Sequence, residues 1–125
     1  VVDTSALIAI LRAEDDAAQY AAALSKAAPI LMSATWRPGL LLTIRRGLPP
    51  AGRLINRPEC KHRGGAGDEA RADIARQAYI EYGKGLNPAG LNYGDCFSYA
   101  LAKANDMPLL FKGEDFARTD IIAAI

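Results

Sequence analysis

The sequence feature that most constrains the fold is the stretch from Leu91 to Lys103, in which a glycine and an acid precede an apolar run. Gly94 interrupts regular structure, and Asp95 stands where a helix is expected to begin. Apolar residues then recur at helical spacing, at Phe97, Ala100, Leu101 and Ala104. This spacing predicts a helix with one buried face. A carboxylate in the first turn is favoured by the unpaired N–H groups and the helix dipole, so a helix start alone explains Asp95.

Two other short apolar runs also lead to an acid. Val1-Val2 precedes Asp3, and Leu109-Leu110-Phe111 lies just before Asp115. Val1-Val2 is predicted to be a short buried strand, and the segments 29–32, 108–111 and 121–125 are predicted to be further strands. Predicted helices separate these strands, and strands that alternate with helices indicate an α/β fold with a parallel sheet covered on both faces.

Further helices are predicted on either side of the central one. A helix over 6–12 follows a turn at 3–5, and a second runs from Glu14 to Ala27, with its first acids on a solvated surface. A third starts at Asp68 and ends at Gly83. Its apolar residues fall largely on one side: Ala72, Ala75, Ala78, Tyr79 and Tyr82. The residues 113–115 turn into a short helix.

The composition excludes several classes of protein. The 125 residues are 50% apolar, which predicts a single domain over 1–125 with a real core. The net charge of +1 gives no global field for nucleic acid or membranes, and the apolar runs are too short to span a bilayer. No secretory signal is recognised, and Cys60 and Cys96 form neither a disulfide framework nor a zinc site. Cys96 is predicted to be a core residue of a protein from a reducing cytoplasm.

The segment 37–67 differs from the rest of the chain. It holds four of the seven prolines, six of the eleven glycines, and seven Lys or Arg residues against the single acid Glu59. We interpret it as an atypical basic, Gly/Pro-rich segment that is mostly loop. Three explanations stay open: an ordinary solvated loop, a surface that binds RNA phosphates, and an out-of-frame reading of GC-rich coding DNA.

The three acids suggest a metal site. Ligands of open α/β sheets sit beyond the carboxyl ends of the strands, where Asp3 and Asp115 would project and where the helix beginning at Asp95 can reach. Carboxylates that converge repel one another and need a cation. Hard oxygen donors without Cys or His select Mg²⁺ or Mn²⁺, ions that suit phosphodiester hydrolysis. His62, in the basic segment, is given no catalytic role.

Three stretches carry a family resemblance: VVDTSALIAIL, YGKGLNPAGLNYGDCFSYALAK and PLLFKGEDFARTDI. They resemble the PIN domain of the VapC-type toxins, over residue 1 to about 35 and over 68–125. The resemblance implies a three-layer α/β/α sandwich with a mainly parallel sheet and a Mg²⁺-dependent endoribonuclease. It also implies a homodimer and a cognate VapB-type antitoxin.

The resemblance also assigns roles to residues. Asp3 and Asp95 become metal ligands, and Asp115 a third acid that completes the metal site or positions water. Thr4 or Ser5 supplies a hydroxyl near the metal. Asp120 is a weaker candidate, interpreted as a cap or surface residue.

One element of the family pattern is missing. The family has an acid, usually Glu, on the helix after the second strand, but no Asp or Glu occurs between Asp16 and Glu59 here. A carboxylate cluster that lacks one member positions its metal poorly, so this sequence is predicted to cleave RNA poorly. The alternative is a catalytically impaired PIN-fold protein that binds an antitoxin or RNA.

Two rival classes fit less well. A receiver-type phosphoacceptor domain has a Lys after a late strand, as Lys112 is here, but it needs an acid pair at the first strand, where Asp3 is followed by Thr-Ser. A phosphatase of the Asp-x-Asp type fails because Ser5 stands at its second Asp. Three tyrosines, Tyr79, Tyr82 and Tyr99, are candidates for either an interface or the core.

Overall fold

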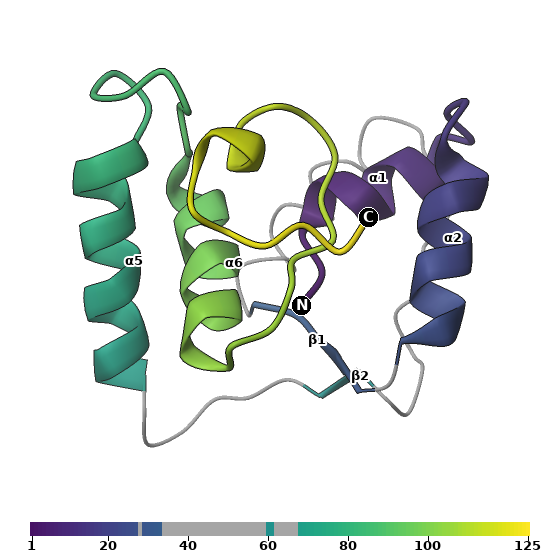
Figure 1. Cartoon of the computed structure of the whole chain (residues 1–125), viewed down its shortest axis with the longest axis horizontal. Coiled ribbons are helices and arrows are strands. Elements are labelled where there is room, and N and C mark those ends of the chain that lie inside the picture. Colours follow the sequence, from purple (N-terminus) through teal and green to yellow (C-terminus); the bar gives the residue numbers. More distant parts are fainter. Residues whose placement is uncertain (28, 34–59, 62–67) are drawn as a thin grey trace.

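The computed structural model describes residues 1–27, 29–33, 60–61 and 68–125, shown in Figure 1. Its helices are α1 (Thr4–Leu11), α2 (Ala17–Lys26), α5 (Asp68–Tyr82), α6 (Tyr93–Ala104) and the 3₁₀ turn η1 (Phe116–Arg118). The predicted helix from Asp68 to Gly83 is confirmed. It ends at Tyr82, and the next position requires glycine, because a Cβ on Gly83 would lie 2.2 Å from the carbonyl oxygen of Tyr79. None of the helices in the described ranges is long and apolar enough to cross a membrane.

The described extended segments pair in parallel. The pairings join β1 (Ile30–Leu31) to β2 (Cys60–Lys61), Val2 to Met32, Val2 to Leu110, and Leu109 to Ala123. All four segments predicted to be strands therefore take part. Val2 pairs with Met32 on one side and with Leu110 on the other. The later segments are therefore added on both sides of the first one. Such a reversal of strand order opens a crevice at the carboxyl ends, where ligands of α/β sheets bind.

Successive residues of these segments enter two different cores. Val1, Leu31 and Leu109 pack in one cluster with residues of α5 and α6, whereas Val2, Ile30 and Leu110 pack in another with residues of α1 and α2. This is the alternation of a strand that is buried on both faces. Figure 1 shows the two helix pairs on opposite sides of the paired segments. The predicted parallel pairing is thus confirmed in the described part of the chain, where the paired segments contribute side chains to two buried clusters.

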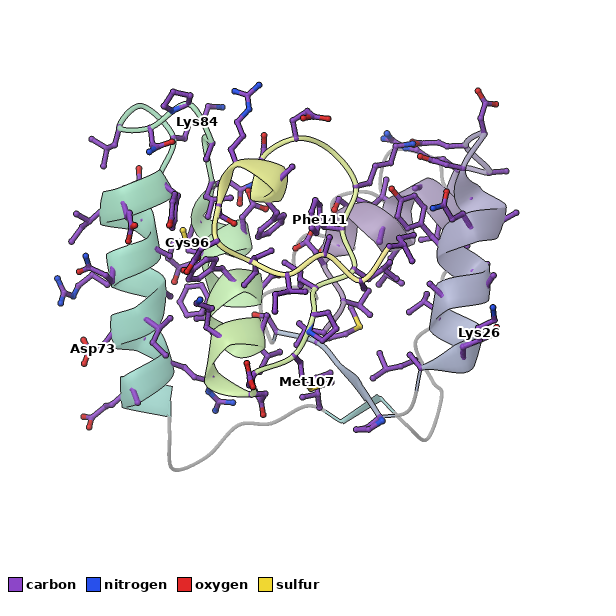
Figure 2. The ribbon with its side chains drawn as sticks, in the orientation of Figure 1. Lys26, Asp73, Lys84, Cys96, Met107 and Phe111 are labelled. Carbon is purple, nitrogen blue, oxygen red and sulfur yellow. The ribbon has the colours of Figure 1, made fainter. Side chains whose placement is uncertain are left out.

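The buried face of α6 is broader than predicted. Ala100 and Leu101 are buried as expected, but Ala104 is exposed and Phe97 is only half-buried. Cys96 is 3% exposed and lies between α5 and α6, as Figure 2 shows, which confirms it as a core residue. The helix packs against α5 on one side and the sheet on the other. More of its circumference is therefore buried, including two polar residues that the apolar pattern did not mark.

The tyrosines divide between core and surface. Tyr99 is buried, its ring centroid lies 5.8 Å from that of half-buried Tyr82, and its hydroxyl donates to Asp120 over 2.6 Å. Tyr79 is 43% exposed and lines an apolar groove of about 330 Å³ between α5 and α6. Of the three interface candidates, only Tyr79 presents a substantial surface.

A second prediction changes at the start of α2. The helix begins at Ala17, and Asp16 is its N-cap without a side-chain capping bond. Glu14 and Asp16 therefore lie before the first turn of the helix and not in it. Both acids form ion pairs with the side chain of Lys112, which is distant from them in sequence.

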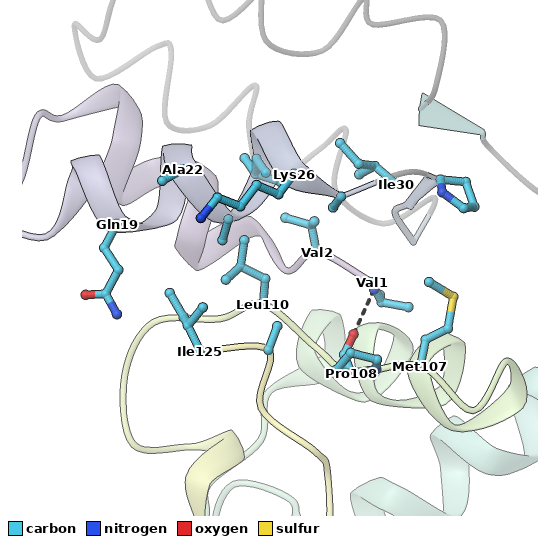
Figure 3. A pocket seen from close by; sticks show the side chains of 15 residues that line it. Val1, Val2, Gln19, Ala22, Lys26, Ile30, Met107, Pro108, Leu110 and Ile125 are labelled. Atoms are coloured by element: carbon cyan, nitrogen blue, oxygen red, sulfur yellow. Dashed lines mark hydrogen bonds between the residues drawn. The ribbon is translucent and has the colours of Figure 1, made fainter.

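A hollow of about 510 Å³ lies at the amino ends of the paired segments. Figure 3 shows the hollow, which is lined mainly by apolar side chains and includes the 2.8 Å hydrogen bond from the Val1 amino group to the Pro108 carbonyl. Its lining contains none of the acids singled out in the sequence. The acids lie at the opposite, carboxyl ends, so this hollow and the candidate chemistry are separate.

Candidate active site

Asp3 lies directly after Val2, at the carboxyl end of the first paired segment, and is 4% exposed. It is also the N-cap of α1, which begins two residues earlier than predicted, because its Oδ2 accepts the Ser5 backbone N–H over 2.9 Å. The Ser5 hydroxyl donates to the same oxygen over 2.7 Å, and the Ser98 hydroxyl donates to Oδ1 over 2.7 Å. Three donors thus hold this buried carboxylate in one orientation.

Asp95 lies in the first turn of α6 and is 8% exposed. The predicted helix-start role is confirmed, because Asp95 and Asn92 form a capping box. Asn92 Oδ1 accepts the Asp95 N–H over 3.2 Å, and Asp95 Oδ2 accepts the Asn92 N–H over 2.8 Å. Its other oxygen, Oδ1, receives no hydrogen bond from any described residue. The cap therefore occupies only half of this carboxylate.

The environment of Asp95 disfavours its charge. Burial, the largest cause, raises the pKa of Asp95 to about 6 from the usual 3.8. The Asn92 N–H lowers this pKa, whereas the negative charges of Asp3 and Asp115 raise it. The three acids that were singled out in the sequence therefore share one electrostatic environment. Perturbation by burial and like charge is typical of functional carboxylates.

Asp115 differs from the other two acids. It is exposed and is the N-cap of η1, and its side chain makes no capping hydrogen bond. Among the described residues, no group of three His, Cys, Asp or Glu side chains lies close enough together to hold a metal ion. Asp3 and Asp95 are both buried and their charges interact, and the charge of the exposed Asp115 also acts on Asp95.

The two hydroxyl candidates also differ. Ser5 Oγ donates to Asp3 and accepts the Lys112 backbone N–H over 3.0 Å. Ser5 thus holds Asp3 and joins it to the segment that follows Leu110. Thr4 is the first residue of α1 and is half-buried, and its hydroxyl has no hydrogen bond to another described residue.

Asp120 lies outside the crevice. It accepts the Tyr99 hydroxyl and, over 2.7 Å, the Lys103 ammonium group, and its side chain is 53% exposed. The hydrogen bond from Lys103 and then that from Tyr99 lower the pKa of Asp120. Its interpretation as a surface residue is confirmed.

Sequence reasoning missed Ser98 and the partners of Lys112. Ser98 follows Asp95 by three residues, so both lie on the same face of α6. That spacing is the signal in the sequence, but a serine does not contribute to the apolar periodicity that marks the buried face. Lys112 was considered only as a feature of receiver domains. Its ion pairs with Glu14 and Asp16 join residues about 100 positions apart, which no local pattern indicates.

Known proteins resemble this chain over almost its whole length. The model of the PIN domain family matches residues 1–122. The chain belongs to the PIN domain family. It is 48% identical to ribonuclease VapC30 of Mycobacterium tuberculosis over 97% of this chain and 95% of the relative. It is 47% identical to ribonuclease VapC of Mycolicibacterium smegmatis, over 98% of each chain. Ribonuclease VapC28 of M. tuberculosis is 45% identical over 100% of this chain and 97% of its own length.

The donor chemistry of the crevice fits a hard divalent cation. Asp3 uses three of the roughly four lone-pair positions of a carboxylate, which leaves one on Oδ1, and Asp95 has its whole Oδ1 available to a ligand. Mg²⁺ is commonly held by one or two carboxylates and several waters. The two acids meet that minimum. The stretch in which the family has an acid after the second strand begins in residues that the structure does not describe, and His62 also lies outside the described residues.

Proposed function

We propose that this PIN-domain protein is a Mg²⁺-dependent endoribonuclease toxin of a toxin–antitoxin pair, which hydrolyses RNA phosphodiester bonds at the crevice of Asp3 and Asp95. One observation carries the proposal: a buried Asp95, half of whose carboxylate receives no described hydrogen bond, lies within the electrostatic influence of Asp3 at the carboxyl end of the first segment. Two buried carboxylates repel each other unless a cation joins them. The relatives are named ribonucleases, which supports the same substrate class.

The residues of the crevice divide the work. Mg²⁺, or Mn²⁺ in its place, would orient a water and offset the negative charge of the transition state. Asp3 and Asp95 would hold the ion, with Asp3 fixed by its serine donors. Asp115, which is exposed, would complete the site or position the water. Ser5 is bonded to Asp3 and Lys112, so it orients the metal ligand, and Thr4 has the hydroxyl that remains available.

We further propose the complete PIN arrangement: one domain over 1–125, a three-layer α/β/α sandwich with a mainly parallel sheet, acting as a homodimer that a VapB-type antitoxin blocks. The apolar groove between α5 and α6 supports a protein interface, because Tyr79, Ile80 and Tyr93 are exposed around it by 43%, 52% and 71%. Sedimentation analysis of the purified chain tests the dimer, and a monomer at micromolar concentration contradicts it.

RNA cleavage by the purified chain, with Mg²⁺ and with EDTA, tests the proposed activity. We expect cleavage with Mg²⁺ that EDTA abolishes and that Asp3→Asn removes. The exposed variant Asp73→Asn is the control, because Asp73 lies on the outer side of α5, as Figure 2 shows, and should keep the wild-type rate. Cleavage that persists in EDTA or in Asp3→Asn contradicts the proposal.

The second candidate function is a catalytically impaired PIN protein that binds an antitoxin or RNA. It is favoured by the absence of any acid between Asp16 and Glu59. If the missing carboxylate limits the rate, then one of the variants Pro38→Glu and Leu41→Glu, which lie outside the described residues, should raise Mg²⁺-dependent cleavage at least about tenfold. Fast cleavage by the unmodified chain argues against impairment.

A further inference from the structure

Lys112 joins two parts of the chain that are far apart in sequence. Its ammonium group binds the Glu14 carboxylate and, over 2.7 Å, the Asp16 carboxylate. Both acids lie in the turn between α1 and α2. The three side chains are about one third exposed, at 33%, 31% and 36%, so this ion-pair cluster is partly shielded from water. We call Lys112, Glu14 and Asp16 the lysine clamp.

The backbone of Lys112 leads to the crevice. Its N–H donates to Ser5 Oγ over 3.0 Å, and Ser5 Oγ donates to Asp3 Oδ2 over 2.7 Å. Asp115 follows Lys112 by three residues, after a turn in which Gly113 has a φ of 106°, a conformation that favours glycine. One residue therefore connects the α1–α2 turn, the serine that holds Asp3, and the segment that carries Asp115.

We propose that Lys112 is a positioning residue of the nuclease site, whose side chain fixes the segment 111–115 and thereby the orientation of Asp3 and the position of Asp115. This inference rests on the proposed function. Groups that orient metal ligands change metal affinity or activity by about 10- to 100-fold when they are removed. The clamp acts on Asp3 through Ser5 and on Asp115 through the chain itself.

A different role for Lys112 is direct contact with an RNA phosphate. The ion pairs argue against it, because the Lys112 ammonium group already faces two carboxylates, although Arg12 also lies 3.9 Å from Glu14 and balances the second negative charge. The two roles predict opposite results when the acids are neutralised. Glu14→Gln with Asp16→Asn would free the ammonium group and strengthen RNA binding if Lys112 bound phosphate. The same double variant would loosen the site if Lys112 is a clamp.

The test compares Lys112→Met, Lys112→Arg, the Glu14→Gln/Asp16→Asn double variant and Lys103→Met. The last is the matched control, since Lys103 forms a similar ion pair with Asp120 away from the crevice. Calorimetric titration with Mg²⁺ in the absence of RNA measures metal affinity, and RNA binding in EDTA measures phosphate contacts. Circular dichroism confirms that each variant is folded.

We expect Lys112→Met and the double variant to weaken Mg²⁺ binding about tenfold and to lower kcat by a similar factor. RNA affinity in EDTA should change less than about twofold in Lys112→Met, and Lys112→Arg and Lys103→Met should remain near wild type. Unchanged Mg²⁺ affinity in Lys112→Met, or tighter RNA binding by the double variant, overturns the inference alone. A wild-type chain that binds no Mg²⁺ overturns both this inference and the proposed function.

Discussion

The two sides of the crevice solve the same problem, a buried carboxylate, in different ways. Asp3 receives three hydrogen bonds that reach both of its oxygens. Asp95 receives one, on Oδ2, and burial raises the pKa of Asp95 to about 6. Hydrogen bonds from the protein replace the lost water at Asp3, whereas nothing in the described chain replaces it at Oδ1 of Asp95. Asp3 is therefore the acid that the protein holds in a fixed orientation, and we call it the anchor. Asp95 is the acid whose charge a bound cation would stabilise.

Removing the anchor should have the largest effect. In Asp3→Asn, an amide nitrogen replaces one of the two oxygens that accept hydrogen bonds from Ser5 and Ser98, so the variant loses its charge and at least one accepted hydrogen bond. We expect Mg²⁺-dependent RNA cleavage to fall on the order of 10³-fold and the free energy of unfolding to fall by about 1–3 kcal/mol. Cleavage assays and urea denaturation measure the two effects. Wild-type stability of this variant would show that the three donors do not hold Asp3 as described.

Neutralising Asp95 should separate activity from stability. We expect Asp95→Asn to lower cleavage about 100-fold and yet to stabilise the apo protein at pH 7 by about 1 kcal/mol. The folded pKa of about 6 lies above the unfolded 3.8, so ionisation of Asp95 destabilises the fold at pH values above about 6. This destabilisation decreases as the pH falls from about 6 to 3.8, and it is absent below about 3.8, where Asp95 is protonated in both the folded and the unfolded chain. Urea denaturation at pH 7 and pH 4 measures the difference, and a variant less stable than wild type at pH 7 contradicts the account.

Removing one donor from the anchor should have an intermediate effect. Ser98→Ala leaves Asp3 Oδ1 without its described hydrogen bond, which should lower the free energy of unfolding by about 1–2 kcal/mol and Mg²⁺ affinity about tenfold. Ser25→Ala is the control, because the Ser25 hydroxyl donates to the Ala22 carbonyl on an exposed face of α2. Equal effects of the two substitutions would mean that the hydrogen bond from Ser98 to Asp3 contributes no more to stability or Mg²⁺ affinity than an exposed hydrogen bond does.

Asp115 should show the smallest effect of the three acids. It is exposed and bonded to no described residue, so Asp115→Asn should change the free energy of unfolding by less than about 0.5 kcal/mol. Cleavage should fall by about tenfold or less, and the pKa of Asp95 should decrease because one neighbouring negative charge is lost. Carbon NMR titration of Asp95 in this variant measures the shift. An increase in that pKa contradicts the shared environment.

The sequence predicted the arrangement of elements better than it predicted the site. Strand segments before Asp3 and before Asp115 follow from short apolar runs, and α5 follows from its acidic start and Gly83, because these signals are local. The hydrogen bonds that hold Asp3 cannot be predicted in this way. Ser98 is 95 positions from Asp3, and its hydroxyl reaches the carboxylate only after α6 packs on the sheet. Glu14 and Asp16 were assigned to a helix start for the same reason: their partner, Lys112, is distant in sequence.

The pKa of Asp95, measured by carbon NMR with and without Mg²⁺, tests the central claim most directly. The account predicts a pKa of about 6 in the apo protein and, at saturating Mg²⁺, a decrease of at least one unit, since a bound cation favours the ionised carboxylate. An apo pKa near the usual 3.8 that Mg²⁺ leaves unchanged would contradict it.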